Sequence, residues 1–187
     1  FENLFDLCAD LSNQFNIHNQ RWAFRDCVFQ LKQRYCQNVL KDETLAKNID
    51  LDSPIPFNFQ HLLNYLKNLN NETRKAEDDK PAYVKEGEHD LFNELIDYTP
   101  KKTRVISGGP LNGELDRLVL RVESRFKDPR YAFMFQYDEP QKGDLEKLVR
   151  QVTGFILKSQ SPITVYDLSY LPSETVGTVV ATISRII

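Results

Sequence analysis

The residues from 130 to 187 constrain the fold most, because their apolar positions alternate between two spacings. Short apolar runs of strand length stand at 131–135 and 163–166, and each is followed by a stretch with helical spacing. Short β-rich runs indicate strands, whereas apolar residues every three or four positions mark one face of a helix. Strands that alternate with helices of ten or more residues predict a parallel sheet with right-handed crossovers. The expected fold class is therefore α/β. The two helical stripes are Leu145, Leu148, Val149, Val152 and Ile156, and then Val176, Val179, Val180 and Ile183.

The first half of the chain is mainly helical by the spacing of its apolar residues. Two sets of apolar residues at helical spacing, named at the end of this paragraph, predict two long helices. A third helix is expected within residues 1–15. Residues 70–88 are polar and almost free of large aliphatic side chains, which predicts a mobile or solvated loop. A short helix is expected at 90–98. The stripes are Phe24, Cys27, Val28, Leu31 and Tyr35, and then Phe59, Leu62, Leu63, Leu66 and Leu69.

Composition is that of a soluble globular protein, with 41% hydrophobic and 27% charged residues and a net charge of −3 over 187 residues. No apolar run is long enough to span a membrane, and the slightly acidic balance gives no general attraction for nucleic acid. Cys8, Cys27 and Cys36 have no CxxC spacing, which favours reduced, buried thiols in the cytosol. The three histidines show no metal-ligand spacing, so no metal site is expected.

The two ends of the chain are abrupt. It begins at Phe1, and its last helical stripe runs to Ile186 and Ile187 without a Gly or Asn cap. Helices usually end on such caps, so we expect this chain to be an internal piece of a larger protein.

Gly108 and Gly113 have the G-x-x-x-x-G spacing of a phosphate-binding loop, behind an expected strand and before a helix. The two following residues contradict that function. Such a loop needs Lys and then Ser or Thr, whereas Glu114 would repel phosphate and Leu115 offers no hydroxyl for magnesium. We therefore expect a turn, with Asn112 as the N-cap of the next helix.

Asp167 stands at the carboxyl end of the second expected strand, where α/β sheets bind their ligands. The pattern resembles a Walker B strand, although a second acid beside it is missing. A turn or capping role and a catalytic role both remain open.

Apolar residues at helical spacing predict a helix that begins near residue 115; they are Leu115, Leu118, Val119, Val122 and Phe126. Arg117, Arg121 and Arg125 are spaced four apart on one face of this helix, and Lys127 and Arg130 follow at its exit. Such a row is usually a solvated face. It can also face a subunit or a phosphate, because Arg offers planar, permanently charged donors.

The last seventy-five residues or so resemble a known family. LDRLVLRVESRFKDPRYAFMF, then a helix, then SPITVYDLSYLPSETVGTVVATISRII is similar to the central region of HerA-like ATPases, the FtsK-related hexameric DNA translocases of bacteria and archaea. The elements that carry the resemblance are Asp128-Pro129-Arg130 before an apolar run, and Asp167-Leu168-Ser169 before Pro172 and a Val-rich helix with Arg185.

The resemblance implies a division into a helical, lid-like insertion at 1–110 and part of a RecA-like core at 111–187. It implies that the intact protein is a cytoplasmic, ATP- and magnesium-dependent translocase or helicase. Such a protein forms a hexameric ring around double-stranded DNA, and it works with a nuclease or another effector in DNA end processing or anti-phage defence.

The resemblance also implies what this piece lacks. In the family, the Walker A loop lies upstream and the Walker B acids lie downstream, so no catalytic or nucleotide-binding residue is expected here and the piece alone should be inactive. Asp167 then lies on the strand before Walker B. Arg130 and Arg185 are candidates for contacts across subunits or with phosphate.

A second hypothesis of another class is a non-enzymatic helical module that binds a protein partner. The acidic balance and the missing signature loops favour it.

Overall fold

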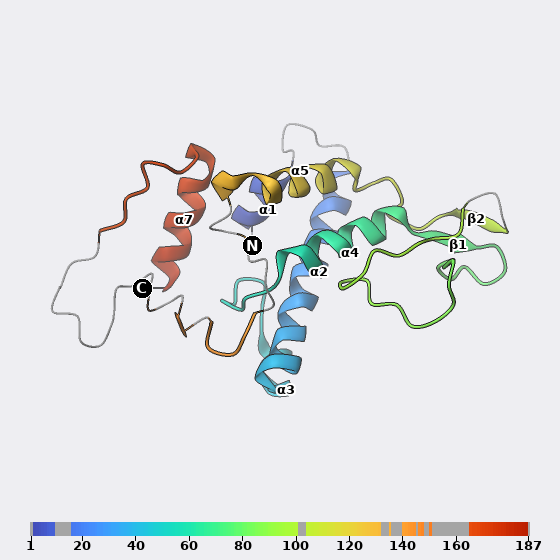
Figure 1. Cartoon of the computed structure of the whole chain (residues 1–187), viewed down its shortest axis with the longest axis horizontal. Helices are drawn as coiled ribbons and strands as arrows, with labels where there is room; N and C mark the ends of the chain where they lie inside the picture. The colour runs from blue at the N-terminus through green and yellow to red at the C-terminus, as the bar shows by residue number, and fades with distance from the viewer. Residues whose placement is uncertain are drawn as a thin grey trace.

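The computed structural model describes residues 2–9, 16–100, 104–131, 135, 140–144, 146–147, 150 and 165–186. This part of the chain is a mixture of helices and one small sheet (Figure 1). The helices are α1 (Glu2–Cys8), α2 (Ile17–Tyr35), α3 (Glu43–Asn48), α4 (Phe59–Asn71), α5 (Asp116–Lys127) and α7 (Ser173–Ile186), with a π-helical turn η1 (Cys36–Leu40) directly after α2 and a 3-10 turn η2 (Pro129–Tyr131) after α5.

The hydrophobic core lies where α2 and α5 both pack on α4, with α1 against α5 (Figure 1). The two apolar stripes predicted for α2 and α5 are buried as expected, and in the α4 stripe only Leu69 is partly buried. Fully burying one such side chain stabilises the fold by about 1.5–3 kcal/mol. The main cluster of buried side chains is continuous and includes residues from both sides of position 110. Its largest fully buried members are Tyr131, Phe5, Phe24, Leu62, Leu66, Leu115 and Leu118.

The sheet differs from the prediction. Strand β1 (Thr73–Lys75) pairs with β2 (Val105–Gly108) in antiparallel register, with Thr73 opposite Gly108. The described residues form no parallel sheet. The expected strand at 131–135 begins instead with Tyr131 in η2, whose N–H donates to the Asp128 carbonyl over 3.0 Å and whose side chain is completely buried.

The second expected strand, at 163–166, is described only at Val165 and Tyr166, which have irregular backbone. Val165 is 83% exposed, so its side chain does not lie in the core. Residues 132–134 and 163–164 lie outside the described part. The helix expected around 145–156 also falls largely outside it, and the first helix is confirmed over Glu2–Cys8 alone.

The last helix is confirmed as α7, which begins directly after Pro172. The Thr175 hydroxyl donates to the Pro172 carbonyl over 2.7 Å, and this side chain is fully buried. The predicted apolar stripe of α7 is only half-buried, and Val180 is 45% exposed.

The loop prediction for 70–88 is wrong at its start, because Thr73–Lys75 forms β1. Thr73 is buried and its hydroxyl donates to the Thr99 carbonyl over 3.0 Å. The Ala82 N–H donates to the Thr73 carbonyl over 2.7 Å. Long-range backbone pairing thus orders a segment whose composition is that of a loop.

The short helix expected at 90–98 is also wrong, because this segment forms turns. The Asp90 carboxylate accepts the Phe92 N–H over 3.0 Å, which makes a local turn. Asn68 of α4 donates to the Leu91 and Glu94 carbonyls and accepts the Ile96 N–H. These bonds take backbone groups that a helix would have used.

The start of α5 corrects the predicted N-cap. Helix α5 begins at Asp116, four residues beyond Asn112, and the Asn112 amide donates instead to the Glu72 carbonyl over 2.9 Å. Gly113 has φ = 77°, in the left-handed region that favours glycine, so the chain turns here before the helix begins. In the part of the chain that the structure describes, no helix is both long and apolar enough to cross a membrane.

Candidate functional site

Arg130, the first residue singled out by the sequence, lies on the surface at the exit of α5. Its guanidinium binds the Asp128 carboxylate in a bidentate way, with the shortest N···O distance at 2.7 Å. Its backbone N–H donates to the same carboxylate over 3.0 Å. These hydrogen bonds lower the pKa of Asp128 below its usual value. The Asp128-Pro129-Arg130 turn is therefore held by an ion pair at the surface, with 65% of the Arg130 side chain exposed.

Asp167 lies in an exposed turn. Its carboxylate accepts the Ser169 N–H over 3.0 Å and the Ser169 hydroxyl over 2.6 Å. The hydroxyl and N–H of Ser169 lower the pKa of Asp167, so the side chain is ionised at neutral pH. Of the two roles left open by the sequence, this geometry favours the turn. Arg185, the remaining candidate, belongs to the last turn of α7.

The arginines of α5 have different environments. Arg117 and Arg121 lie on the exposed side, and Arg121 donates to the Ala9 carbonyl over 3.2 Å. Arg125 is half-buried, donates to the Tyr131 hydroxyl and lies 4.9 Å from the centre of that ring. Arg125, at one end of the row, thus holds the turn after α5, whereas Arg117, at the other end, is exposed.

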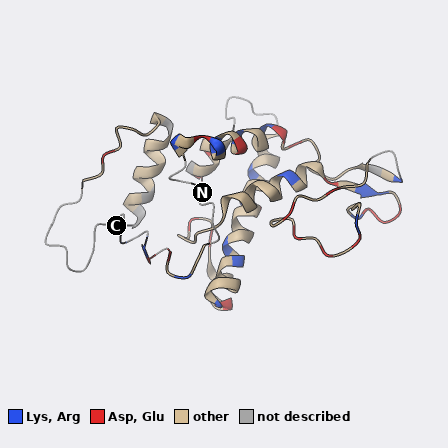
Figure 2. Cartoon of the chain, in the orientation of Figure 1, with Lys and Arg blue, Asp and Glu red and all other residues tan. Residues whose placement is uncertain are grey.

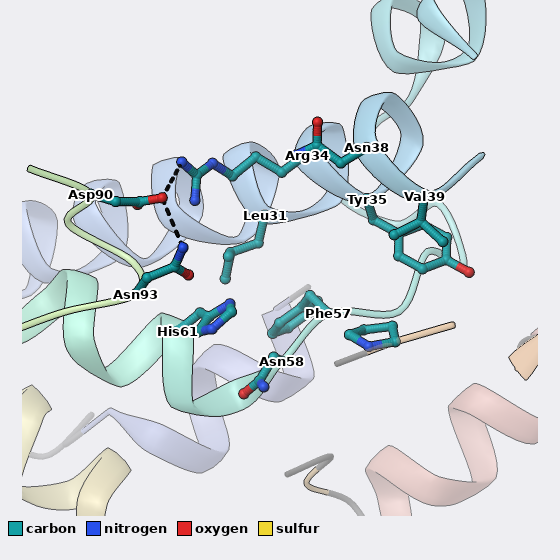
Figure 3. A pocket seen from close by; sticks show the side chains of 11 residues that line it. Leu31, Arg34, Tyr35, Asn38, Val39, Phe57, Asn58, His61, Asp90 and Asn93 are labelled. Carbon is teal, nitrogen blue, oxygen red and sulfur yellow. Dashed lines mark hydrogen bonds and ion pairs between the residues drawn. The ribbon is translucent and has the colours of Figure 1, made fainter. Parts of the chain in front are cut away.

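The structure also forms a pocket that the sequence did not indicate, between the end of α2, the start of α4 and the turn at 90–93 (Figure 3). Its volume is about 220 Å³. The lining is mixed, with an apolar side and several amides, and consists of Leu31, Arg34, Tyr35, Asn38, Val39, Phe57, Asn58, His61, Asp90, Asn93 and Pro140. Asn38 and Val39 come from η1, where the wider π-helical turn continues α2.

The wall of this pocket is built on an ion pair between Arg34 and Asp90, with an N···O distance of 2.9 Å. Asp90 also accepts from the Asn93 amide over 3.0 Å, as Figure 3 shows. The Arg34 guanidinium lies 4.4 Å from the centre of the Phe92 ring. Burial opposes ionisation of Asp90, but hydrogen bonds from Arg34 and from the Phe92 N–H lower its pKa overall. The wall is therefore charged and rigid at neutral pH.

The other polar groups at this pocket also stabilise the fold. Asn58 caps α4 by accepting the Gln60 N–H over 2.8 Å, and the Tyr35 hydroxyl donates to the Gln141 carbonyl over 2.9 Å. Small-molecule sites typically enclose about 300–1,000 Å³. A smaller pocket lined by amides is better suited to one inserted side chain than to a cofactor.

Sequence reasoning missed this pocket because its partners are far apart. Arg34 and Asp90 are separated by 56 positions, and neither belongs to a local motif. Among the described residues, no group of three or more His, Cys, Asp or Glu side chains is arranged to hold a metal ion. The three cysteines are free thiols, and all are buried, which confirms that part of the prediction.

Comparison with known proteins gives no relative: no protein-family model and no curated protein sequence matches this chain.

Proposed function

We propose that this chain is an internal segment of a HerA-like, ATP-dependent translocase or helicase that acts on double-stranded DNA. The observation that carries the proposal is the pair of sequence elements at 128–135 and 167–185, which resemble that family in both composition and order. The intact protein would use ATP and magnesium, assemble as a hexameric ring in the cytoplasm, and act with a nuclease or effector in DNA end processing or phage defence.

The local structure at both elements supports the proposal. Helix α5 ends at Lys127, directly before the Asp128-Pro129-Arg130 turn, and α7 begins directly after Pro172. These are the places where the resemblance requires a helix to end and a helix to begin. The RecA-like parallel sheet belongs to the proposal and would need strands from other parts of the intact protein.

In this proposal the chain contributes contact surfaces and no catalytic group. The helical part at 1–110 acts as a lid or partner surface. Arg130 is held by Asp128 at the exit of α5, and its exposed guanidinium suits it to meet a carboxylate or phosphate of the next subunit. Arg185 has the same proposed role from the end of α7.

The first test concerns the gene that encodes the intact protein. The proposal expects G-x-x-x-x-G-K-[ST] upstream of Phe1 and an apolar strand with paired acids downstream of Ile187. If neither motif is present, the proposal is wrong.

A second test concerns the two arginines. In the intact protein, the double change Arg130→Ala and Arg185→Ala should weaken ring assembly or ATP turnover, whereas Lys47→Ala on the exposed side of α3 should leave both unchanged. If the double variant assembles and hydrolyses ATP normally, these residues have no role across subunits.

A helical protein-interaction module is the second candidate, and one observation favours it. Trp22 on α2 is 55% exposed beside a groove. Large exposed aromatic side chains are typical of protein contacts. This candidate predicts that the intact protein does not hydrolyse ATP, while Trp22→Ala still abolishes binding to its partner.

A further inference from the structure

A groove of about 550 Å³ lies between the exposed side of α2 and the turn after α3. Its apolar lining comes from Trp22, Phe29, Ile49 and Leu51. Phe29 packs on the small buried cluster that includes Ile49, so this side of the groove is anchored in the core. Trp22 is 55% exposed and supplies the largest uncovered apolar surface in the groove. An exposed aromatic side chain over a fixed apolar wall is a suitable anchor for another protein surface.

The rim of the groove is acidic. Asp26, Asp50 and Asp52 line it together with one cation, Arg25. The Asp50 carboxylate accepts from the Ser53 hydroxyl and from the Ser53 and Asp52 N–H groups, which lowers the pKa of Asp50. The Asp50 carboxylate is therefore ionised at neutral pH and fixed in direction. The occupant that fits such a groove is apolar at its centre and basic at its edges.

The turn that carries Asp50 and Asp52 is held in place by Lys32 from α2. The Lys32 ammonium donates to the Leu51 carbonyl over 2.6 Å and to the Ser53 carbonyl over 2.7 Å. The acidic rim is thus fixed relative to α2 before any partner binds, which reduces the entropy cost of binding.

The same chain carries a surface of the opposite kind on α5. Leu120 is 66% exposed, and Arg117 and Arg121 lie beside it on the exposed side of the helix, where Arg121 also donates to the Ala9 carbonyl over 3.2 Å. Basic positions recur along α5 in Figure 2. Asp116 is also on this side, but its carboxylate accepts from the Asn70 amide over 2.7 Å. An apolar side chain between two arginines on one helix face matches the groove in both polarity and charge.

We propose that the groove of one copy binds the exposed face of α5 of a second copy, with Leu120 against Trp22 and with Arg117 and Arg121 against the acidic rim. The contact cannot form within one chain, because the buried face of α5 fixes this helix on α4. The groove and the α5 face are different surfaces, so the contact is head-to-tail. A pair of copies therefore has an unoccupied groove at one end and an unoccupied α5 face at the other. Head-to-tail contacts generate rings when the rotation closes. The inference names the partner of this groove and needs neither ATP nor DNA.

The experiment uses sedimentation of the 187-residue chain without nucleotide. The groove variant is Trp22→Ala with Asp52→Lys, and the helix variant is Arg117→Glu with Leu120→Ser. The control is Lys47→Glu, a charge reversal at an exposed position of α3 outside both surfaces. Circular dichroism and urea unfolding verify that every variant is folded.

The wild-type chain and the control are expected to associate as protein concentration rises, more weakly at high salt. Each surface variant should associate at least about tenfold more weakly. A mixture of the two variants should form a one-to-one dimer and nothing larger, because only one intact groove and one intact α5 face remain to pair. Monomeric wild-type chain, or a mixture that does not pair, would overturn the inference. ATP turnover of the intact protein is a separate measurement, so the function proposed above can fail while this contact holds.

Discussion

Asn70 at the end of α4 caps the start of α5 by accepting the backbone N–H of Leu115 over 2.9 Å. The Asn70 side-chain NH2 group donates to the Asp116 carboxylate over 2.7 Å, and the Asn70 backbone carbonyl accepts the Gly113 N–H over 3.0 Å. The N-terminal N–H groups of a helix have no partner within the helix, and here a side chain from another helix supplies one. This residue therefore joins two helices of the core through polar contacts.

Replacing Asn70 with Ala should lower the free energy of unfolding by about 1–3 kcal/mol, because the buried Leu115 N–H loses its acceptor. Asn71→Ala is the matched control, since Asn71 is exposed at the next position. Urea unfolding of both variants measures the difference. Equal stability of the two variants would show that the cap contributes nothing.

The two leucines of α5 should differ sharply in their effect on stability. Leu118 is completely buried, whereas Leu120 is 66% exposed. Leu118→Ala should lower the free energy of unfolding by about 2–5 kcal/mol, because it leaves a cavity. Leu120→Ala should change it by less than about 0.5 kcal/mol. Thermal or urea unfolding measures both, and a large loss for Leu120→Ala would mean that this face is covered within the chain.

Lys32 should make stability depend on pH. Burial lowers the pKa of this ammonium from 10.5 to about 8, although Asp52 and Asp50 partly oppose the effect. Between about pH 8 and 10.5, the unfolded chain therefore holds a proton that the folded chain has released. The free energy of unfolding therefore rises with pH across that window. Below pH 8 the buried Lys32 ammonium is charged, and its destabilising effect on the fold is fully present.

The measurement compares the wild-type chain with Lys32→Met by urea unfolding at several pH values. The free energy of unfolding of the wild-type chain minus that of the variant should increase as pH rises, by about 1–3 kcal/mol in total. The difference between the two curves isolates this group from other titrations. A flat difference across the window would contradict a buried, charged Lys32.

The thiols should be unreactive in the folded chain. Burial raises the pKa of Cys8 to about 12, against the effect of Arg125 and Arg121, and burial also raises the pKa values of Cys27 and Cys36. Because the thiolate is the reactive form, a disulfide reagent at pH 8 should label the native chain slowly and all three positions in urea. Rapid labelling of the native chain would contradict the packing of α1 and α2.

Much of the helical core could be predicted from local spacing. The α5 stripe that runs from Leu115 to Phe126 is buried as expected, because a single helix face needs only its own sequence to be recognised. Sequence-based prediction fails where the hydrogen-bond or packing partner of a residue lies far away in the sequence. β1 could not be predicted, since Thr73 is ordered by a strand more than thirty residues later.

The errors at the site have the same cause. Asn112 has the right residue type for an N-cap, but α5 begins only at Asp116, and Asn70, 45 positions before Leu115, supplies the acceptor. The turn at 90–93 has a helical pattern that Asn68 overrides through tertiary hydrogen bonds. The pocket beside Arg34 and the groove beside Trp22 likewise join segments that no local pattern connects.

The measurement that tests the central proposal most directly is ATP turnover by the intact protein that contains this chain, with and without double-stranded DNA. We expect magnesium-dependent hydrolysis that duplex DNA stimulates, and no hydrolysis by the 187-residue chain alone. A folded intact protein that does not hydrolyse ATP under either condition would contradict it, and the chain would then be best explained as a protein-interaction module.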